Sequence, residues 1–288
     1  MSTDNAHALD RVLAETFAVA RAEIFDMVKS IRFAFLVISY AFAAGIVGSA
    51  LLWVNEKMEG KLLMGAAGLG ESERTAIVEG LAEQGMSTYL AEAILNGDLP
   101  PMVFGVLFFS TFSIPLLMLL VGFNRISEDV STRYTRYLLQ RVHRGSYLAG
   151  KLIGHWLVSF VAIVIVHIAL LSYAKINDLY DMESTIAAMP RIWFALLLLV
   201  LGYSAYTTLV SATLNPPILV LLLGVIFLMG IRVVQFFLGL MYEPLGKVWM
   251  GSWDVELYAL DPIAVAIYLG YAAVFIALAH LVLRRRDL

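Results

Sequence analysis

Long apolar stretches separated by polar segments dominate the pattern along the chain. A helix needs about 20 apolar residues to cross the roughly 30 Å hydrocarbon core of a membrane. Six stretches reach this length, at about 33–54, 103–123, 152–174, 192–213, 217–240 and 262–283. They are continuous apolar runs, whereas a barrel strand alternates between apolar and polar residues. The sequence therefore predicts an all-α polytopic membrane protein with six transmembrane helices, in a single transmembrane domain over residues 1–288.

Composition supports a membrane protein and excludes several kinds of chemistry. The chain is 60% hydrophobic and 15% charged, while a soluble domain is roughly 45–50% apolar. It has no cysteine, which excludes disulfides, thiolate catalysis and cysteine metal sites. The net charge of −3 is the sum of acidic and basic segments at different places, so it does not indicate binding to nucleic acid.

Residues 1–32 have no apolar core followed by a small-residue cleavage site, so we do not expect them to form a cleavable signal peptide. Apolar residues recur there at helical spacing, and polar ones lie between them: Leu9, Val12, Leu13, Phe17, Ile24, Val28 and Ile31. We expect an amphipathic helix at the cytoplasmic membrane interface. A helix packed on a soluble partner is the alternative.

Basic and acidic residues separate between the polar segments. Residues 124–151 contain six basic and two acidic side chains, and Arg284, Arg285 and Arg286 make the C-terminal segment basic. Residues 55–102 are mainly acidic, with short helices expected at about 71–84 and 87–96. Because short basic loops stay in the cytoplasm, we expect residues 124–151 and both termini to be cytoplasmic and residues 55–102 to be extracytoplasmic.

The basic segment 124–151 has the apolar rhythm of an amphipathic helix. Its apolar side is formed by Ile126, Val130, Tyr134, Tyr137, Leu138 and Val142. Arginines occupy much of the remaining surface, at Arg133, Arg136, Arg141 and Arg144. We expect this helix to couple the membrane spans to another protein. The alternative is that the arginines only enforce topology and bind anionic headgroups.

The same segment resembles the cytoplasmic loop of permeases of type-two ATP-binding-cassette (ABC) exporters. In that family an acidic residue after the second span precedes a Leu-Leu pair, a basic residue and Gly-Lys-Leu. The corresponding residues here are Glu128, Leu138, Leu139, Arg144 and Gly150-Lys151-Leu152. The family also favours Gly-Thr after the acidic residue and a proline before the basic one, where this chain has Thr132-Arg133 and Arg141. The six spans, the long first outer loop and the tight turn at 215–217 agree with the resemblance.

The resemblance implies a permease subunit, not itself an enzyme, in a prokaryotic inner membrane. It would pair with a second copy or a related permease, contact membrane lipids, and rest on a separate cytosolic ATPase subunit. The chain has no GxxxxGK[ST] phosphate loop, so ATP and Mg would bind to that partner and no cofactor to this chain. The residues implied to couple to the ATPase are Glu128, Asp129, Arg133, Tyr134, Arg136, Tyr137, Arg141, Arg144 and Lys151.

Three residues within the spans are candidates for a transport pathway or gate. Arg232 lies deep in the fifth span, where a charge needs a partner or a water-filled cavity; alternatively, the span breaks near Gly230 and Arg232 reaches the outer interface. His167 is a candidate proton or ligand group, or only bonds a neighbouring helix. Pro115 is a candidate hinge or a packing adaptation.

Trp249, Trp253 and Tyr258, between the fifth and sixth spans, predict an aromatic belt at the outer interface, with a gate as the alternative.

Two other classes of function compete with a transporter. A membrane scaffold or assembly factor would use the same basic loop to hold a cytosolic protein. An intramembrane lipid-modifying enzyme needs a catalytic constellation, and the sequence contains neither a GxSxG nor an HExxH motif. The apolar spans weakly favour an amphiphilic or lipid-like cargo, without identifying it.

Overall fold

The computed structural model describes residues 3–57, 70–83, 101–176, 182–242 and 247–286, and the regular structure in these ranges is helical. The long helices are α1 (Thr3–Lys29), α2 (Ile31–Lys57), α4 (Glu71–Glu83), α6 (Pro101–Gly122), α9 (Arg144–Ile176), α10 (Met182–Thr213), α11 (Pro217–Met241) and α14 (Pro262–Arg285). Short helices are α7 (Ser127–Ser131), α8 (Tyr134–Leu139), η2 (Met250–Ser252) and α13 (Asp254–Tyr258). In the described residues, five helices are long and apolar enough to cross a membrane, and a sixth span results if the bent pair α1–α2 counts as one. The chain is thus an all-α multi-pass membrane protein.

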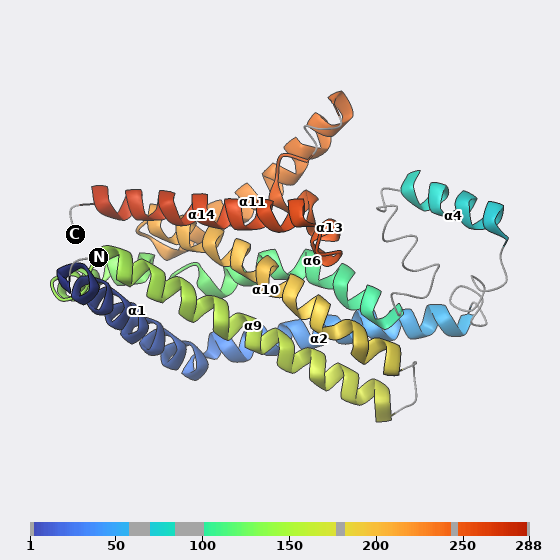
Figure 1. Ribbon diagram of the computed structural model, residues 1–288, viewed down its shortest axis with the longest axis horizontal. Coiled ribbons are helices and arrows are strands. Elements are labelled where there is room, and N and C mark those ends of the chain that lie inside the picture. Colours follow the sequence, from blue (N-terminus) through green and yellow to red (C-terminus); the bar gives the residue numbers. More distant parts are fainter. Residues whose placement is uncertain (1–2, 58–69, 84–100, 177–181, 243–246, 287–288) are drawn as a thin grey trace.

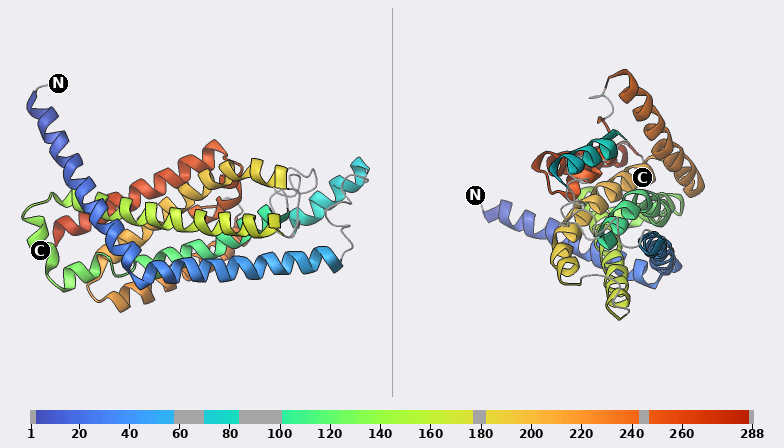
Figure 2. Two further views of the ribbon diagram at one scale, coloured as in Figure 1. Left: turned by 90° about the horizontal axis from the view of Figure 1, so that it is seen from below. Right: turned by 90° about the vertical axis from the view of Figure 1, so that its right-hand side faces the viewer.

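The long helices form an elongated bundle with α10 at its centre (Figure 1). Helix α10 packs against α6, α9 and α14, which explains why its residues Leu196, Leu199 and Tyr203 are buried. Helix α1 begins and α14 ends at the same end of the bundle, where α7 and α8 also lie, while α4 lies toward the opposite end (Figures 1 and 2). This places the basic segment beside both chain ends, as the sequence predicted.

Each predicted span coincides with a long helix, but the third and fourth helices begin earlier than predicted, and α10 starts at Met182 rather than near residue 192. Helix α9 begins at Arg144, not near residue 152. The residues from Arg144 to Lys151, which the sequence placed in the polar loop, are therefore the first two turns of a membrane helix. The connection between α6 and α9 is correspondingly shorter than expected.

Helix α1 confirms that the N-terminal segment is helical, and it crosses α9 at two glycines. A Cβ atom on Gly150 would lie 2.6 Å from Val19 Cβ, and one on Gly154 would lie 2.7 Å from Glu23 Cβ. Small residues four apart allow such close approach of two helices. Leu13 and Phe17 remain exposed on another face of α1, and between α1 and α2 the chain bends by 65°.

Helix α11 is continuous from Pro217 to Met241, so the alternative of a break near Gly230 is wrong. It leans away from the other helices (Figures 1 and 2), and many of its apolar side chains, such as Ile226 and Phe236, are exposed. In the 55–102 segment, α4 agrees with the first predicted short helix. The second, at 87–96, lies outside the described residues.

Candidate coupling site

The segment between α6 and α9 is two short helices rather than the single amphipathic helix predicted. Helix α7 ends before Arg133, whose φ of 62° lies in the left-handed region, and α8 begins at Tyr134. The backbone N–H groups of Ile126 and Ser127 donate to Ser211 Oγ, at 3.0 and 3.2 Å, which fixes the start of α7 against α10. The two helices therefore present their side chains in different directions.

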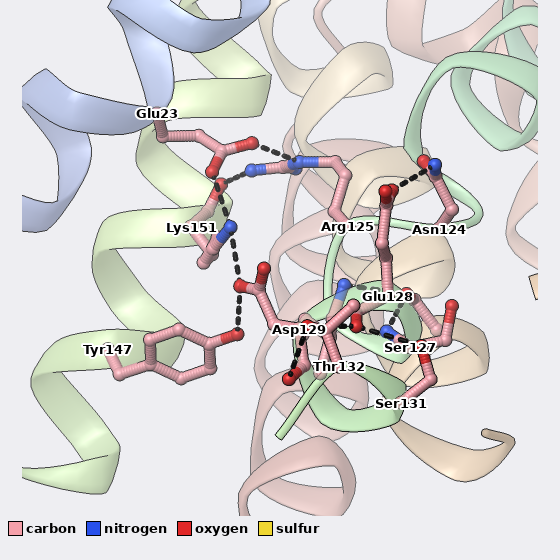
Figure 3. A network of polar contacts seen from close by, with 12 residues as sticks. Glu23, Asn124, Arg125, Ser127, Glu128, Asp129, Ser131, Thr132, Tyr147 and Lys151 are labelled. Atoms are coloured by element: carbon pink, nitrogen blue, oxygen red, sulfur yellow. Dashed lines mark hydrogen bonds and ion pairs between the residues drawn. The ribbon is translucent and has the colours of Figure 1, made fainter. Parts of the chain in front are cut away.

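A buried network of charges joins this segment to α1 and α9 (Figure 3). Glu23 on α1 accepts from Arg125 Nε at 2.6 Å and pairs with Lys151 Nζ at 2.8 Å. Lys151 also lies 2.8 Å from Asp129 Oδ2, which accepts from the Tyr147 hydroxyl at 2.8 Å. Arg125 additionally donates to the backbone carbonyl of Lys151. Two cations and two anions balance one another, as burial of charge requires.

The electrostatics of this network keep Glu23 ionised. Burial acts to raise the pKa of Glu23, but Arg125 and Lys151 more than offset it and lower the pKa to about 2. The carboxylate therefore stays charged throughout the physiological range. Charge-assisted hydrogen bonds of this length are about twice as strong as neutral ones, so the network holds α1, α7 and α9 together.

Glu128 and the far end of the segment make further contacts. Glu128 Oε2 lies 3.2 Å from Arg32 Nη2 and accepts from Asn124 Nδ2 at 2.6 Å, linking the start of α2 to α7. Arg144 donates to the carbonyl oxygens of Leu283 and Arg284, at 3.1 and 2.8 Å, at the end of α14. Last-turn carbonyls of a helix have no partner within it, so Arg144 caps α14 and fixes the start of α9.

His143, just before α9, is tied to α1. Its backbone N–H donates to Glu15 Oε2 at 2.9 Å, and its Nδ1 lies 2.7 Å from the same oxygen. These hydrogen bonds, mainly the backbone one, lower the pKa of Glu15 to about 2. The turn between α8 and α9 is thereby held against the N-terminal helix.

The remaining predicted residues lie on the outer surface. Tyr134 and Tyr137 are 53% and 71% exposed, and Arg133, Arg136 and Arg141 are exposed beside them. None of these three arginines forms an ion pair within the described ranges. The nine predicted coupling residues thus divide into four that are anchored inside the chain (Glu128, Asp129, Arg144 and Lys151) and five that form this surface, which we call the α8 surface.

Sequence analysis missed Glu23, Arg125 and Tyr147, which complete the buried network. Glu23 lies four residues after Val19 and four before Met27, both buried. The available signal was an acidic residue in the middle of a helix face whose other residues are small or apolar. Arg125 and Tyr147 gave no such signal, because their partners are distant or on another helix.

Two of the three candidate pathway residues lie at one cavity, and the third lies elsewhere. Arg232 and Pro115 both line a cavity of about 510 Å³ between α6, α10 and α11. His167 lies away from it, with Nε2 2.7 Å from the Tyr40 hydroxyl on α2, which matches the alternative of a bond to a neighbouring helix. Trp249 and Tyr258 are buried and line the same cavity, so the prediction of an interfacial belt is wrong for these two residues, while Trp253 is half-buried.

The described residues contain no group of three His, Asp or Glu side chains placed to hold a metal ion. A scan against models of protein families and a search of curated proteins each found no match to this chain.

Proposed function

We propose that this chain is the membrane-spanning permease subunit of an ABC exporter in a prokaryotic inner membrane, with both termini cytoplasmic. It pairs with a second copy or a related permease and is driven by a separate ATPase subunit, which binds ATP and Mg. The observation that carries the proposal is the α8 surface, an exposed basic and aromatic patch next to a buried ion network. The resemblance of the loop motif to the family supports it.

The α8 surface has the composition of a protein-binding patch. Arginine and tyrosine are enriched among the residues that contribute most to protein interfaces. Exposed arginines such as Arg133 and Arg136 suit charge-assisted contacts with an acidic groove, and Tyr137 offers an apolar ring with a polar end. An ATPase subunit with a complementary groove is the partner we infer.

The contacts that join α7 and α8 to the long helices suit the transmission of force. Helix α8 is separated from α9 by a four-residue turn that is tied to Glu15, and α7 is tied through Asp129 to Lys151 of α9. A displacement of α8 is passed to α9, α1 and α6, because buried ion pairs of 2.6 to 2.8 Å resist relative sliding. Closure of the motor then changes the tilt of the spans and the side to which the pathway opens.

A test compares substitutions on the α8 surface with a matched control. The tagged protein is purified in mild detergent from its native cells, co-purified proteins are identified by mass spectrometry, and ATPase activity is measured. Arg136→Glu and Tyr137→Ala each change an exposed residue of α8. Arg21→Glu makes the same charge change at an exposed residue of α1, and serves as control.

We expect the wild type and Arg21→Glu to recover a cytosolic ABC ATPase, and both α8 variants to lose it at least about tenfold. The proposal is overturned if no ATPase is recovered, or if the α8 variants retain it. A partner that hydrolyses ATP at the same rate with and without this chain indicates the scaffold alternative instead. No observation favours the intramembrane enzyme.

A further inference from the structure

The cavity of about 510 Å³ has an apolar wall and a polar end. Phe112 and Leu116 of α6 and Val225, Leu228 and Met229 of α11 form the apolar wall. Arg232, Asp254 and Tyr203 form the polar end. A largely apolar pocket of this size with a few convergent polar groups is typical of small-molecule sites.

At the polar end, Arg232 is only partly engaged. Its Nη1 donates to the carbonyl oxygen of Gly251 at 2.9 Å, while its Nη2 lies 3.5 Å from Asp254 Oδ2, too far for a strong hydrogen bond. A guanidinium has five N–H donors. Donor capacity therefore remains at the cavity for a ligand that carries oxygen acceptors.

Tyr203 adds a second donor at the same place. Its side chain is buried, and its hydroxyl lies near Arg232 and Tyr268 without a hydrogen bond of good geometry in the described part of the chain. A Cβ atom on Gly251 would collide with the Arg232 guanidinium and would lie 2.8 Å from the Tyr203 hydroxyl. The glycine thus leaves room for both groups to converge, and a buried hydroxyl without a partner is costly unless a ligand satisfies it.

The apolar side of the cavity borders the outer surface of the bundle. Phe112 on α6 and Met229 on α11 line it and are 68% and 57% exposed. Both belong to helices that are long and apolar enough to cross a membrane, so in the single chain this surface is open to hydrocarbon. A molecule enters most readily from the bilayer.

We propose that the cavity binds an amphiphile with one apolar chain and an anionic oxygen head, a carboxylate or a phosphate ester, with the head at Arg232 and Tyr203. The planar guanidinium suits two-point contact with such a head, and the chain lies along Leu116 and Val225. That the cavity binds such an amphiphile does not depend on the proposed function. That the amphiphile is the exported cargo rests on the proposed function.

Asp254 acts as the counter-charge when no anion is bound. It is buried, accepts from the Tyr268 hydroxyl, and faces Arg232, with Tyr203, Tyr258 and Glu256 also near. Burial raises the pKa of Asp254 to about 7, although Arg232 acts to lower it. An anion that reaches Arg232 repels the Asp254 carboxylate, so a proton on Asp254 accompanies binding. Binding therefore strengthens as the pH falls toward about 7 and levels off below it, where Asp254 is already protonated in the free protein.

The test uses the purified full chain without any ATPase, in nanodiscs of phosphatidylcholine. The probes are a photoreactive long-chain carboxylate, an alkyl phosphate with the same photoreactive group, and the matching fatty alcohol. Labelled peptides are identified by mass spectrometry, and unlabelled oleate is the competitor. Lys175→Gln, which removes an exposed positive charge at the end of α9, is the control for net charge.

We expect both anionic probes to label peptides of α6 and α11 in competition with oleate, and the alcohol to label them at least about tenfold less. Arg232→Gln lowers anionic labelling about tenfold and Lys175→Gln does not. Asp254→Asn keeps the labelling and removes its dependence on pH. Because Arg232→Gln leaves Asp254 without its cation, the double variant Arg232→Gln/Asp254→Asn is also measured and is expected to label as weakly as Arg232→Gln.

Equal labelling by the alcohol, or full anionic labelling of the double variant, overturns the proposal. Which anionic probe labels more strongly distinguishes a carboxylate from a phosphate head. Since no ATPase is present, failure here leaves the exporter proposal intact, and failure to recover an ATPase leaves this site intact.

Discussion

Replacing Glu23 by glutamine tests whether the buried network holds α1, α7 and α9 together. The side chains of Glu23 and Arg125 are only 8% and 5% exposed, and Glu23 lies within 2.8 Å of both Arg125 and Lys151. Glutamine keeps the shape and offers one oxygen to Arg125, but its amide N–H₂ then faces the Lys151 ammonium. The network is left with two cations and one anion, and removal of one partner from a buried pair costs about 3–5 kcal/mol.

The pKa of Glu23 gives a second estimate of the same quantity. The folded protein lowers the pKa from 4.5 to about 2, and one pKa unit corresponds to about 1.4 kcal/mol. The ionised Glu23 therefore contributes on the order of 3 kcal/mol above pH 4.5, in agreement with the first estimate. Because the folded pKa is depressed, this contribution is lost as the pH falls from about 4.5 through about 2.

The assay is unfolding of the detergent-purified protein by added SDS, followed by tryptophan fluorescence. Glu23→Gln is expected to lose about 3 kcal/mol of unfolding free energy at pH 7, and the difference from wild type should shrink below pH 4.5. Arg32→Gln removes the pair with Glu128, in which Arg32 is 37% exposed, and should cost at most about 1 kcal/mol. Equal effects of the two variants at pH 7 would refute the structural role assigned to Glu23.

Three further outcomes follow from the geometry. Gly150→Ala places a Cβ atom 2.6 Å from Val19 Cβ and 2.9 Å from the Thr16 carbonyl oxygen, so α1 must move away from α9 at a cost of about 1–3 kcal/mol. This variant should be cleaved faster by trypsin within α1. The control Gly145→Ala, whose new Cβ atom has its nearest neighbour 3.9 Å away, should be cleaved at the rate of the wild type. Arg133→Val should lower the unfolding free energy by about 1–2 kcal/mol, because a β-branched residue is strained at a φ of 62°. Arg133→Asn should leave the unfolding free energy unchanged, since asparagine tolerates this conformation. Equal SDS unfolding curves of the two variants would contradict this prediction. The raised pKa of Asp254 means that the folded state holds a proton that the unfolded state has lost between about pH 4 and 7. The melting temperature of the wild type should therefore fall relative to that of Asp254→Asn as the pH rises through this range, and a constant difference between the two would contradict the raised pKa.

The spans were predictable because each depends on a local property, a run of about 20 apolar residues. The start of α9 was not, because Arg144 and Lys151 look like loop residues in sequence. Within the fold Arg144 is satisfied by the last carbonyls of α14, and Lys151 by Glu23 and Asp129. Polar side chains whose partners are distant in sequence can therefore extend a membrane helix by two turns, and the local sequence pattern does not reveal the extension.

The break between α7 and α8 was missed for a different physical reason. Helical periodicity describes where side chains point, but the break lies in the backbone of Arg133, and the start of α7 is fixed by a hydroxyl of α10, Ser211. The residues of the α8 surface were nevertheless predicted individually, since exposed arginines and tyrosines were recognised by type. Their separation from the anchored residues Glu128 and Lys151 required the three-dimensional contacts.

Helices α6 and α10 connect the coupling site to the cavity. On α6, Phe112 lies at the cavity and Arg125 follows just beyond the helix end, about 20 Å away at 1.5 Å per residue. On α10, Tyr203 lies at the cavity and Ser211 holds the start of α7. A rigid helix cannot move at one end only, so under the proposed function a docked ATPase that displaces α7 would also change the spacing of Phe112 and Tyr203 across the cavity. A cavity ligand that favours one spacing would then favour ATPase docking in the matching state to the same extent, and the two proposed sites would share one conformational equilibrium.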